Sequence, residues 1–219
     1  MSEKTGETLL EVKNLRTSFQ TDAGIVQSVR GISFHANRGE SLGIVGESGC
    51  GKSVSMLSIM RLLADNAHLK ADKILFNGED LLHKTAKEMR SIQGNRIGMI
   101  FQDPMTSLNP LFTVEEQLCN PLMRHLKLSK KEAKARALKM LEDVGIPSPE
   151  KRLSQFPHEL SGGMRQRIMI AMALICNPKV LFALLEIVGI SNGFIKLMSG
   201  FKAFTLTLFT VYVAFGLYL

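Results

Sequence analysis

The segment from Gly46 to Ser53 reads Gly-Glu-Ser-Gly-Cys-Gly-Lys-Ser, and its residue types and spacing suit the binding of a phosphate chain. Glycines let the backbone wrap closely around an anion and point its N–H groups inward. The lysine supplies a positive charge for the β- and γ-phosphates, and the serine hydroxyl ligates magnesium. The sequence therefore predicts a P-loop for a nucleoside triphosphate with Mg²⁺. The predicted contact residues are Gly46, Glu47, Ser48, Gly49, Cys50, Gly51, Lys52 and Ser53, with Lys52 catalytic and Ser53 a metal ligand.

Gln102 is a second candidate because it directly follows the apolar run Ile97–Phe101. The carboxyl ends of strands in an open α/β sheet face the ligand crevice. A glutamine there can ligate Mg²⁺ through its amide oxygen and orient an attacking water, which would make it both a metal ligand and a catalytic residue. On its own, such a glutamine is more often an ordinary surface residue.

A serine and two glycines, Ser161, Gly162 and Gly163, begin a predicted helix within the segment Leu160–Arg167. Bare N–H groups and the positive end of the helix dipole make such a start a second anion site. The alternative is an N-cap serine followed by glycines, without a ligand. Two such sites in one chain are unusual.

These candidates require a strand, a loop and a helix in the order that the flanking residues predict. The apolar run Glu40–Val45 leads into the P-loop, and Val54–Leu63 has helical spacing. Alternating strands and helices predict an α/β domain with a largely parallel sheet, preceded by an antiparallel β layer. The other predicted elements are strands at Leu9–Phe19, Ile25–Ala36, Lys73–Phe76, Arg96–Phe101 and Val180–Ala183, and helices that begin at Thr113, at Ser129 (ending at Val144) and at Ser161 (ending at Leu174).

The composition fits a globular chain of 219 residues with 45% hydrophobic and 21% charged residues. The net charge of +7 is interspersed with acidic residues, as in Lys130–Arg136, which favours a solvated helix face over a nucleic-acid patch. Three separated cysteines and five histidines without ligand spacing indicate neither a disulfide framework nor a metal cluster. The N-terminal residues are polar, so we expect no export signal.

Together, the three candidate segments resemble the ATP-binding subunits of ABC transporters. Gly46–Ser53 resembles their Walker A motif, Gln102 their Q-loop glutamine, and Leu160–Gln166 their signature motif. The resemblance implies ATP and Mg²⁺ as ligands and a head-to-tail dimer with a second ABC ATPase subunit. Phe19 stands where the family has a ring that stacks on adenine, although plain core packing is an equal alternative. The residues that would contact the ATP held by the partner are Ser161, Gly162, Gly163 and Gln166.

Longer stretches narrow the resemblance to importers of oligopeptides, dipeptides or nickel, and to the D-type ATPase of the pair that such importers use. The similar stretches are Gly51–Met56, Phe101–Pro110 and Phe156–Arg167. Membership would place the chain on the cytoplasmic face of the cell membrane, bound to two transmembrane permease subunits. An extracytoplasmic substrate-binding protein would be an indirect partner, and nucleic acid would not be one. The segment after Gln102, through Arg124, would meet the permease.

The family pattern stops after the strand Val180–Ala183. An Asp and a Glu should follow, but Leu184 and Leu185 occupy those positions, so the Mg²⁺ anchor and the group that polarises water are missing. Glu186 could replace the Glu only after a one-residue slip, which turns strand side chains to the other face. Three alternatives stay open: an importer ATPase subunit, a non-hydrolysing nucleotide-binding module, and a non-functional truncated gene product.

The composition changes at the same point. Residues 184–219 hold only three charged side chains, and Ala203–Leu219 holds none. We interpret 184–219 as a hydrophobic tail foreign to the family, arising from a frameshift or an insertion. A marginal membrane anchor and a strand-forming, aggregation-prone stretch are the alternatives. The predicted fold is an α/β P-loop NTPase domain of the ABC type over 8–183, with an N-terminal antiparallel β layer, a helical subdomain at about 103–175, and its C-terminal part missing.

Overall fold

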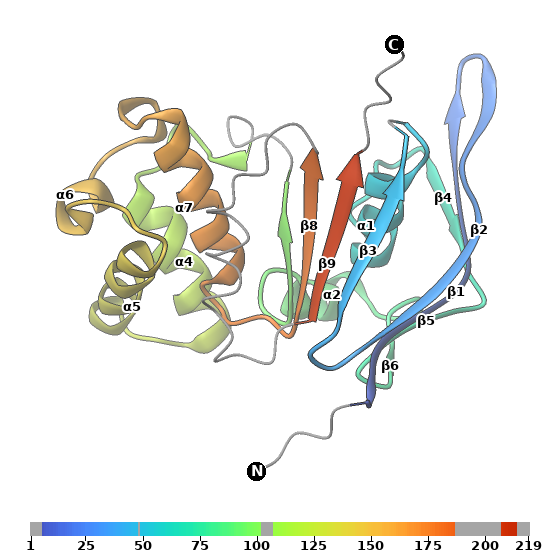
Figure 1. Cartoon of the computed structure of the whole chain (residues 1–219), viewed down its shortest axis with the longest axis horizontal. Coiled ribbons are helices and arrows are strands. Elements are labelled where there is room, and N and C mark those ends of the chain that lie inside the picture. The colour runs from blue at the N-terminus through green and yellow to red at the C-terminus, as the bar shows by residue number, and fades with distance from the viewer. Residues whose placement is uncertain (1–5, 48, 102–106, 187–206, 214–219) are drawn as a thin grey trace.

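The structure is a computed structural model that describes residues 6–47, 49–101, 107–186 and 207–213. Figure 1 shows an antiparallel sheet at one end, a parallel sheet in the middle and a group of helices at the other end. The antiparallel sheet has the order β2-β1-β5-β6, and β4 also pairs with β1. Its strands are β1 (Thr8–Thr21), β2 (Gly24–Asn37), β4 (Ala67–Lys70), β5 (Lys73–Phe76) and β6 (Glu79–Asp80). This sheet is the predicted N-terminal β layer, to which the structure adds two short strands, β4 and β6.

The parallel sheet has the order β3-β9-β8-β7. Its strands are β3 (Ser41–Gly46), β7 (Ile97–Ile100), β8 (Val180–Glu186) and β9 (Thr207–Val213). β8 is longer than the predicted strand Val180–Ala183, because its pairing with β9 continues through Glu186. β9 comes from the hydrophobic tail, so this part of the tail forms a strand in the central sheet.

Helix α1 (Lys52–Met60) lies between the two sheets and shares one core with them and with α2 (Ala86–Ile92). The hydroxyl oxygens of Thr17 in β1 and Ser58 in α1 form a buried hydrogen bond of 2.7 Å. The helix was predicted over Val54–Leu63 but ends at Met60, since Arg61 adopts φ 52° and its N–H caps two carbonyls of the last turn. The buried members of this core include Leu10, Leu15, Met56, Ile59, Ile92, Ile97 and Phe182.

The helical end of the molecule has a core of its own. It is built from α4 (Val114–Leu126), α5 (Lys130–Asp143), α6 (Pro149–Leu153), the 3-10 helix Pro157–Glu159 and α7 (Gly162–Leu174). α7 also packs on the parallel sheet, where Ile170 and Leu174 meet Leu181 of β8. A Cβ on Gly98 of β7 would lie 2.6 Å from the carbonyl oxygen of Ala173, so this close approach requires glycine. α7 therefore joins the helical end to the sheet.

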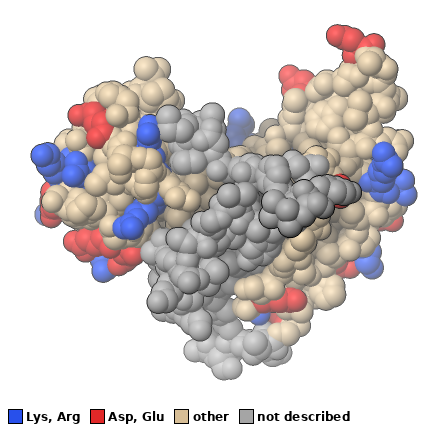
Figure 2. Space-filling model, turned by 45° about the horizontal axis from the view of Figure 1, so that its top comes forward, with Lys and Arg blue, Asp and Glu red and all other residues tan. Residues whose placement is uncertain are grey.

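The charges on the described surface are mixed in sign. On the face shown in Figure 2, Lys and Arg alternate with Asp and Glu over the helical end. Two of the ion pairs there join Lys134 to Glu115 at 2.7 Å and Lys139 to Asp143 at 2.8 Å. Among the described residues, no cluster of His, Cys, Asp or Glu is arranged to hold a metal ion. Among the helices that the structure describes, none has the length and apolar character of a membrane span.

Three helices begin with the same reciprocal capping box, in which a Thr or Ser and a Glu three residues later cap each other. The boxes of α4 (Thr113 and Glu116) and α5 (Ser129 and Glu132) were predicted. The box of α2, Thr85 with Glu88, was missed because the helix that it opens is short and has little apolar periodicity.

These boxes predict a loss of stability in acid. Hydrogen bonds donated by the capping residue hold the pKa values of Glu88, Glu116 and Glu132 below the usual range for glutamate. A carboxyl group whose pKa is lower in the folded state stabilises it above the unfolded pKa, and this contribution is lost as the pH falls through the folded pKa. We therefore expect the free energy of unfolding to decrease between about pH 5 and pH 3.

Chemical denaturation at pH 7 and at low pH will measure this dependence. The double variant Glu116→Gln and Glu132→Gln should show a smaller difference between the two pH values than the wild-type chain. The control is Glu142→Gln, at an exposed position in the last turn of α5. An acid dependence that is the same in the double variant and the wild type would contradict the prediction.

Candidate functional site

The predicted P-loop connects the end of β3 at Gly46 to the start of α1 at Lys52, and Ser48 lies outside the described residues. The Lys52 ammonium donates to the carbonyl oxygens of Gly46 and Glu47, at 2.5 Å each, and lies 3.2 Å from the Cys50 sulfur. Lys52 is only 6% exposed. Among the side chains that the structure describes, no carboxylate pairs with its ammonium group. A buried cation that lacks a counter-charge is unfavourable, so the loop is prepared for an anion.

Two glycines give the loop its shape for different reasons. Gly49 and Gly51 both have positive φ, 79° and 95°, which glycine adopts without strain. A Cβ on Gly49 would meet nothing within 4 Å, whereas a Cβ on Gly51 would lie 2.3 Å from the carbonyl oxygen of Ser28 in β2. The antiparallel sheet therefore presses directly on the P-loop. No sequence signal near Ser28 indicates this contact.

The start of α1 adds further phosphate-binding features. Gly51, its N-cap, offers no side-chain hydrogen bond, and the first turn holds no acidic residue. The first N–H groups of a helix have no partner within it and carry a partial positive charge. Ser53 is the second residue of α1, so its hydroxyl lies at this same end and supplies an oxygen that suits Mg²⁺. The described members of the predicted contact set thus come together in one loop and one helix start.

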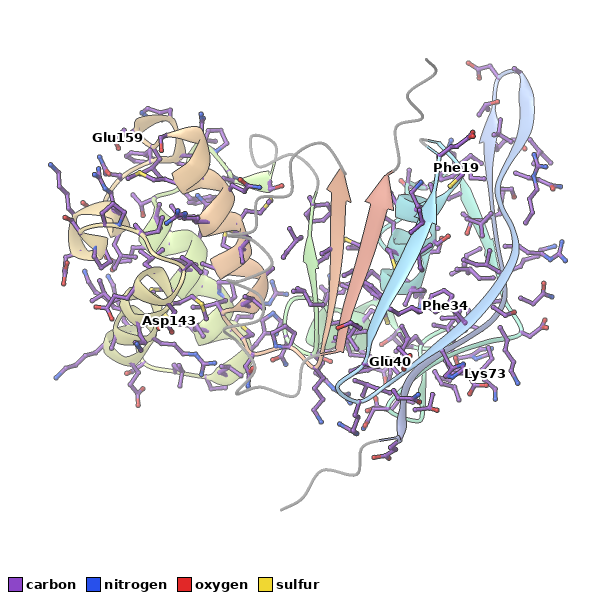
Figure 3. All side chains as sticks on the ribbon, viewed as in Figure 1. Phe19, Phe34, Glu40, Lys73, Asp143 and Glu159 are labelled. Carbon is purple, nitrogen blue, oxygen red and sulfur yellow. The ribbon has the colours of Figure 1, made fainter. Side chains whose placement is uncertain are left out.

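Phe19 lies near the end of β1, where it pairs with Val26 of β2 and Ala67 of β4. It is half-buried, and Figure 3 shows it near the tip of β3, at the end of the molecule that carries the P-loop. Its contact with adenine stays a prediction. Gln102 lies outside the described residues, just after the 41%-exposed Phe101, so its roles as metal ligand and catalytic residue also stay predictions.

The second predicted anion site lies at the start of α7. The hydroxyl of Ser161 caps this helix and accepts a hydrogen bond of 3.4 Å from the N–H of Met164. Gly162 and Gly163 are exposed, and a Cβ on either would meet nothing within 4 Å. No neighbour in the described chain therefore requires glycine at these positions. Two residues without side chains leave the helix start open to a molecule from outside, and the exposed Gln166 lies one turn further along.

The two predicted anion sites do not meet within one chain. Figure 3 labels Glu159, two residues before Ser161, on the opposite side of the molecule from Phe19, and the parallel sheet lies between them in Figure 1. At the edge of that sheet, Val213 of β9 pairs with both Gly46 of β3 and Glu186 of β8. The end of β8 is thus level with the first residue of the P-loop. Leu184 and Leu185, where acidic residues were expected, belong to this strand.

Comparison with known proteins supports the predicted family. The sequence matches the ABC transporter family over residues 29–183. It is 57% identical to the oligopeptide transport ATP-binding protein OppD of Bacillus subtilis (strain 168), a match that covers 80% of this chain and 49% of that protein. It is also 57% identical to the dipeptide transport ATP-binding protein DppD of the same organism, over 81% of this chain and 53% of that protein. The chain spans about half the length of these curated relatives.

Solved structures support the fold. The dimeric structure of MJ0796, a bacterial ABC transporter cassette, matches 94% of this chain and 88% of its own with a TM-score of 0.80 and 24% identity. CbiO1 from Clostridium perfringens, part of an ABC transporter complex, matches 95% of this chain and 79% of its own with a TM-score of 0.72 and 26% identity. The predicted P-loop NTPase fold of the ABC type is therefore confirmed. Because the family match spans most of the chain and contains both the P-loop and the start of α7, this chain belongs to the ABC transporter family.

Proposed function

We propose that the chain binds ATP with Mg²⁺ as the ATP-binding subunit of an importer for oligopeptides or dipeptides. The observation that carries this proposal is Lys52, a buried ammonium held at the base of a glycine-rich loop by carbonyl oxygens. The names of the relatives OppD and DppD support a peptide as the transported substrate. Nickel, the other predicted substrate, is supported by the sequence resemblance alone.

The chain's own residues suggest how the nucleotide is bound. The first N–H groups of α1 point at the phosphates, and Lys52 exchanges its carbonyl contacts for phosphate oxygens. The Ser53 hydroxyl and the Gln102 amide oxygen hold Mg²⁺, which would neutralise charge on the β- and γ-phosphates. Phe19 stacks on the adenine ring from the side of β1.

A second ABC ATPase subunit is the proposed partner that completes the site. The start of α7 is open, and it lies away from the P-loop of its own chain. In a head-to-tail pair, Ser161, Gly162 and Gly163 would contact the nucleotide bound to the partner. The cassette MJ0796 is described as a dimer, in one case bound to ADP and Pi, which supports this arrangement.

The proposed membrane partners are two permease subunits, served by an extracytoplasmic substrate-binding protein, and the chain would lie on the cytoplasmic face of the membrane. Leu111 is 79% exposed and Phe112 is 45% exposed, just before α4. Exposed large apolar residues suit a protein interface. On the face shown in Figure 2, the described charges are mixed in sign and form no basic patch of the kind that a nucleic-acid partner requires.

A second candidate function is a nucleotide-binding module that does not hydrolyse ATP. Leu184 and Leu185 favour it, because the end of β8 lies level with the P-loop but carries leucines where acids were expected. The two candidates share the binding step and differ in the chemical step, so separate experiments test each.

The first experiment compares Gly51→Ala with Gly49→Ala. Both changes put a side chain at positive φ, but only alanine at 51 collides with the carbonyl of Ser28. We expect Gly51→Ala to weaken the binding of a fluorescent ATP analogue with Mg²⁺ at least tenfold, or ~1.4 kcal/mol, and Gly49→Ala to weaken it less. Lys52→Ala serves as the reference for a lost phosphate contact. Equal losses in the two glycine variants would contradict the role of Ser28, and a wild-type chain that binds no nucleotide would overturn the proposed function.

The second experiment tests the open start of α7. Gly163→Glu places a negative charge at the proposed anion site without a clash in its own chain, so the midpoint of thermal unfolding should hardly change. The variant should lose any association of two subunits that the wild type shows by sedimentation with ATP and Mg²⁺. Ala135→Glu, an equal change of charge at an exposed position of α5, should associate normally. Normal association of Gly163→Glu would exclude the start of α7 from the interface.

The third experiment separates the two candidate functions. With protein in excess over ATP, we expect the wild-type chain to release no more phosphate than Lys52→Ala, since no acidic residue stands at 184 or 185. Phosphate release above this control would exclude the non-hydrolysing module. If Glu186→Gln then abolished the release, the substitute carboxylate would be Glu186.

A further inference from the structure

A strand from outside the family match fills the middle of the parallel sheet. β9 pairs with β3 on one side, from Ser41 with Leu208 to Gly46 with Val213. On the other side it pairs with β8, from Val180 with Thr207 to Glu186 with Val213. Figure 1 shows it between these two strands. The family match ends at residue 183, so β9 has no counterpart in it.

The structural comparison extends further than the sequence comparison. MJ0796 and CbiO1 match 94% and 95% of this chain, whereas the family match stops at residue 183. Residues 184–219 make up a larger share of the chain than the share that these structural matches leave uncovered. The matches therefore include part of the tail. Part of the tail therefore matches the cassette fold although its sequence lies outside the family match.

Without β9, the sheet would have a gap one strand wide. β3 and β8 would stand two strand spacings apart, roughly 9–10 Å, which is too far for hydrogen bonds between them. Each would present a row of unpaired N–H and C=O groups to the other. The gap accepts one parallel strand, and the segment Thr207–Val213, rich in β-branched and aromatic residues and free of charge, has the composition of a strand in such a sheet.

We propose that residues 207–213 act as a surrogate strand, which occupies an acceptor site between β3 and β8 and thereby holds the P-loop in place. The link to the P-loop is Val213, whose pairing with Gly46, the first residue of the loop, is the last in the β3–β9 ladder. The occupant is the chain's own tail, because residues 187–206 exceed the dozen or so residues that a parallel crossover needs. The expected effect on nucleotide binding rests on the proposed function, whereas the pairing of the strands does not.

Hydrogen exchange of the full-length wild-type chain tests the pairing directly. If β9 is central, the amides of 207–213 should exchange as slowly as those of β3 and β8, because the strands open as one unit. Fast exchange in 207–213 beside slow exchange in β3 and β8 would overturn the proposal. This measurement needs neither nucleotide nor a variant.

Val211→Pro tests what the strand does. Val211 pairs with Ile44 of β3 and Leu184 of β8, and proline there removes a ladder N–H and is poorly tolerated in a central strand. The expected result is at least tenfold faster amide exchange in both neighbours and at least tenfold weaker binding of the ATP analogue. The control Val211→Ile, in the same strand, should behave like the wild type. Unchanged exchange in β3 and β8 of Val211→Pro would overturn the acceptor site.

Two further measurements keep the result decisive. A synthetic peptide that carries residues 203–217 between added terminal lysines should restore slow exchange to β3 in Val211→Pro, which shows that the site takes a strand and that the variant is otherwise folded. The wild-type chain should sediment without nucleotide as a 24.2 kDa monomer. A dimer that exchanges tails between copies would overturn the claim that each chain fills its own site. Loss of exchange protection with nucleotide binding unchanged would remove the link to the P-loop.

Discussion

The site depends on the placement of one positive charge in a nearly buried position. Lys52 has carbonyl oxygens and a thiol around its ammonium and, among the side chains described, no carboxylate. Such an arrangement is stable only while the loop holds the carbonyl groups toward the lysine. The buried ammonium becomes more stable when a phosphate supplies the missing negative charge. The loop must therefore be rigid enough to hold the charge and open enough to admit the ligand.

Three contacts from distant parts of the chain supply that rigidity. The carbonyl of Ser28 in β2 packs against Gly51, the hydrogen bond between Thr17 and Ser58 ties β1 to α1, and β9 pairs with Gly46. None of the three is local to the P-loop. The antiparallel layer is thus more than an addition to the domain, because it fixes the start of α1 relative to β3.

The local chemistry of the site could be predicted because it resides in short stretches of sequence. The P-loop, the Ser161 cap of α7 and two capping boxes each consist of residues a few positions apart, and the structure has all of them. The contact between Ser28 and Gly51 could not be predicted, because it joins a strand whose sequence shows only alternation to a loop far along the chain. The length of β8 was also missed, since an apolar run gives no sign of which partner strand extends it. Its partner β9 came from a tail whose composition allowed several structures.

The carboxyl ends of the parallel strands explain how such a chain can bind ATP without hydrolysing it. Binding requires groups on β3, the P-loop and α1, which the chain has, whereas the expected acids belong at the end of β8. Pairing through β9 brings Glu186 level with Gly46, so β8 reaches the edge where those acids would act. Backbone pairing tolerates leucine at 184 and 185 as readily as it would tolerate acidic residues, since the ladder uses only main-chain groups. The fold can therefore hold the P-loop beside a strand β8 that carries leucine at 184 and 185.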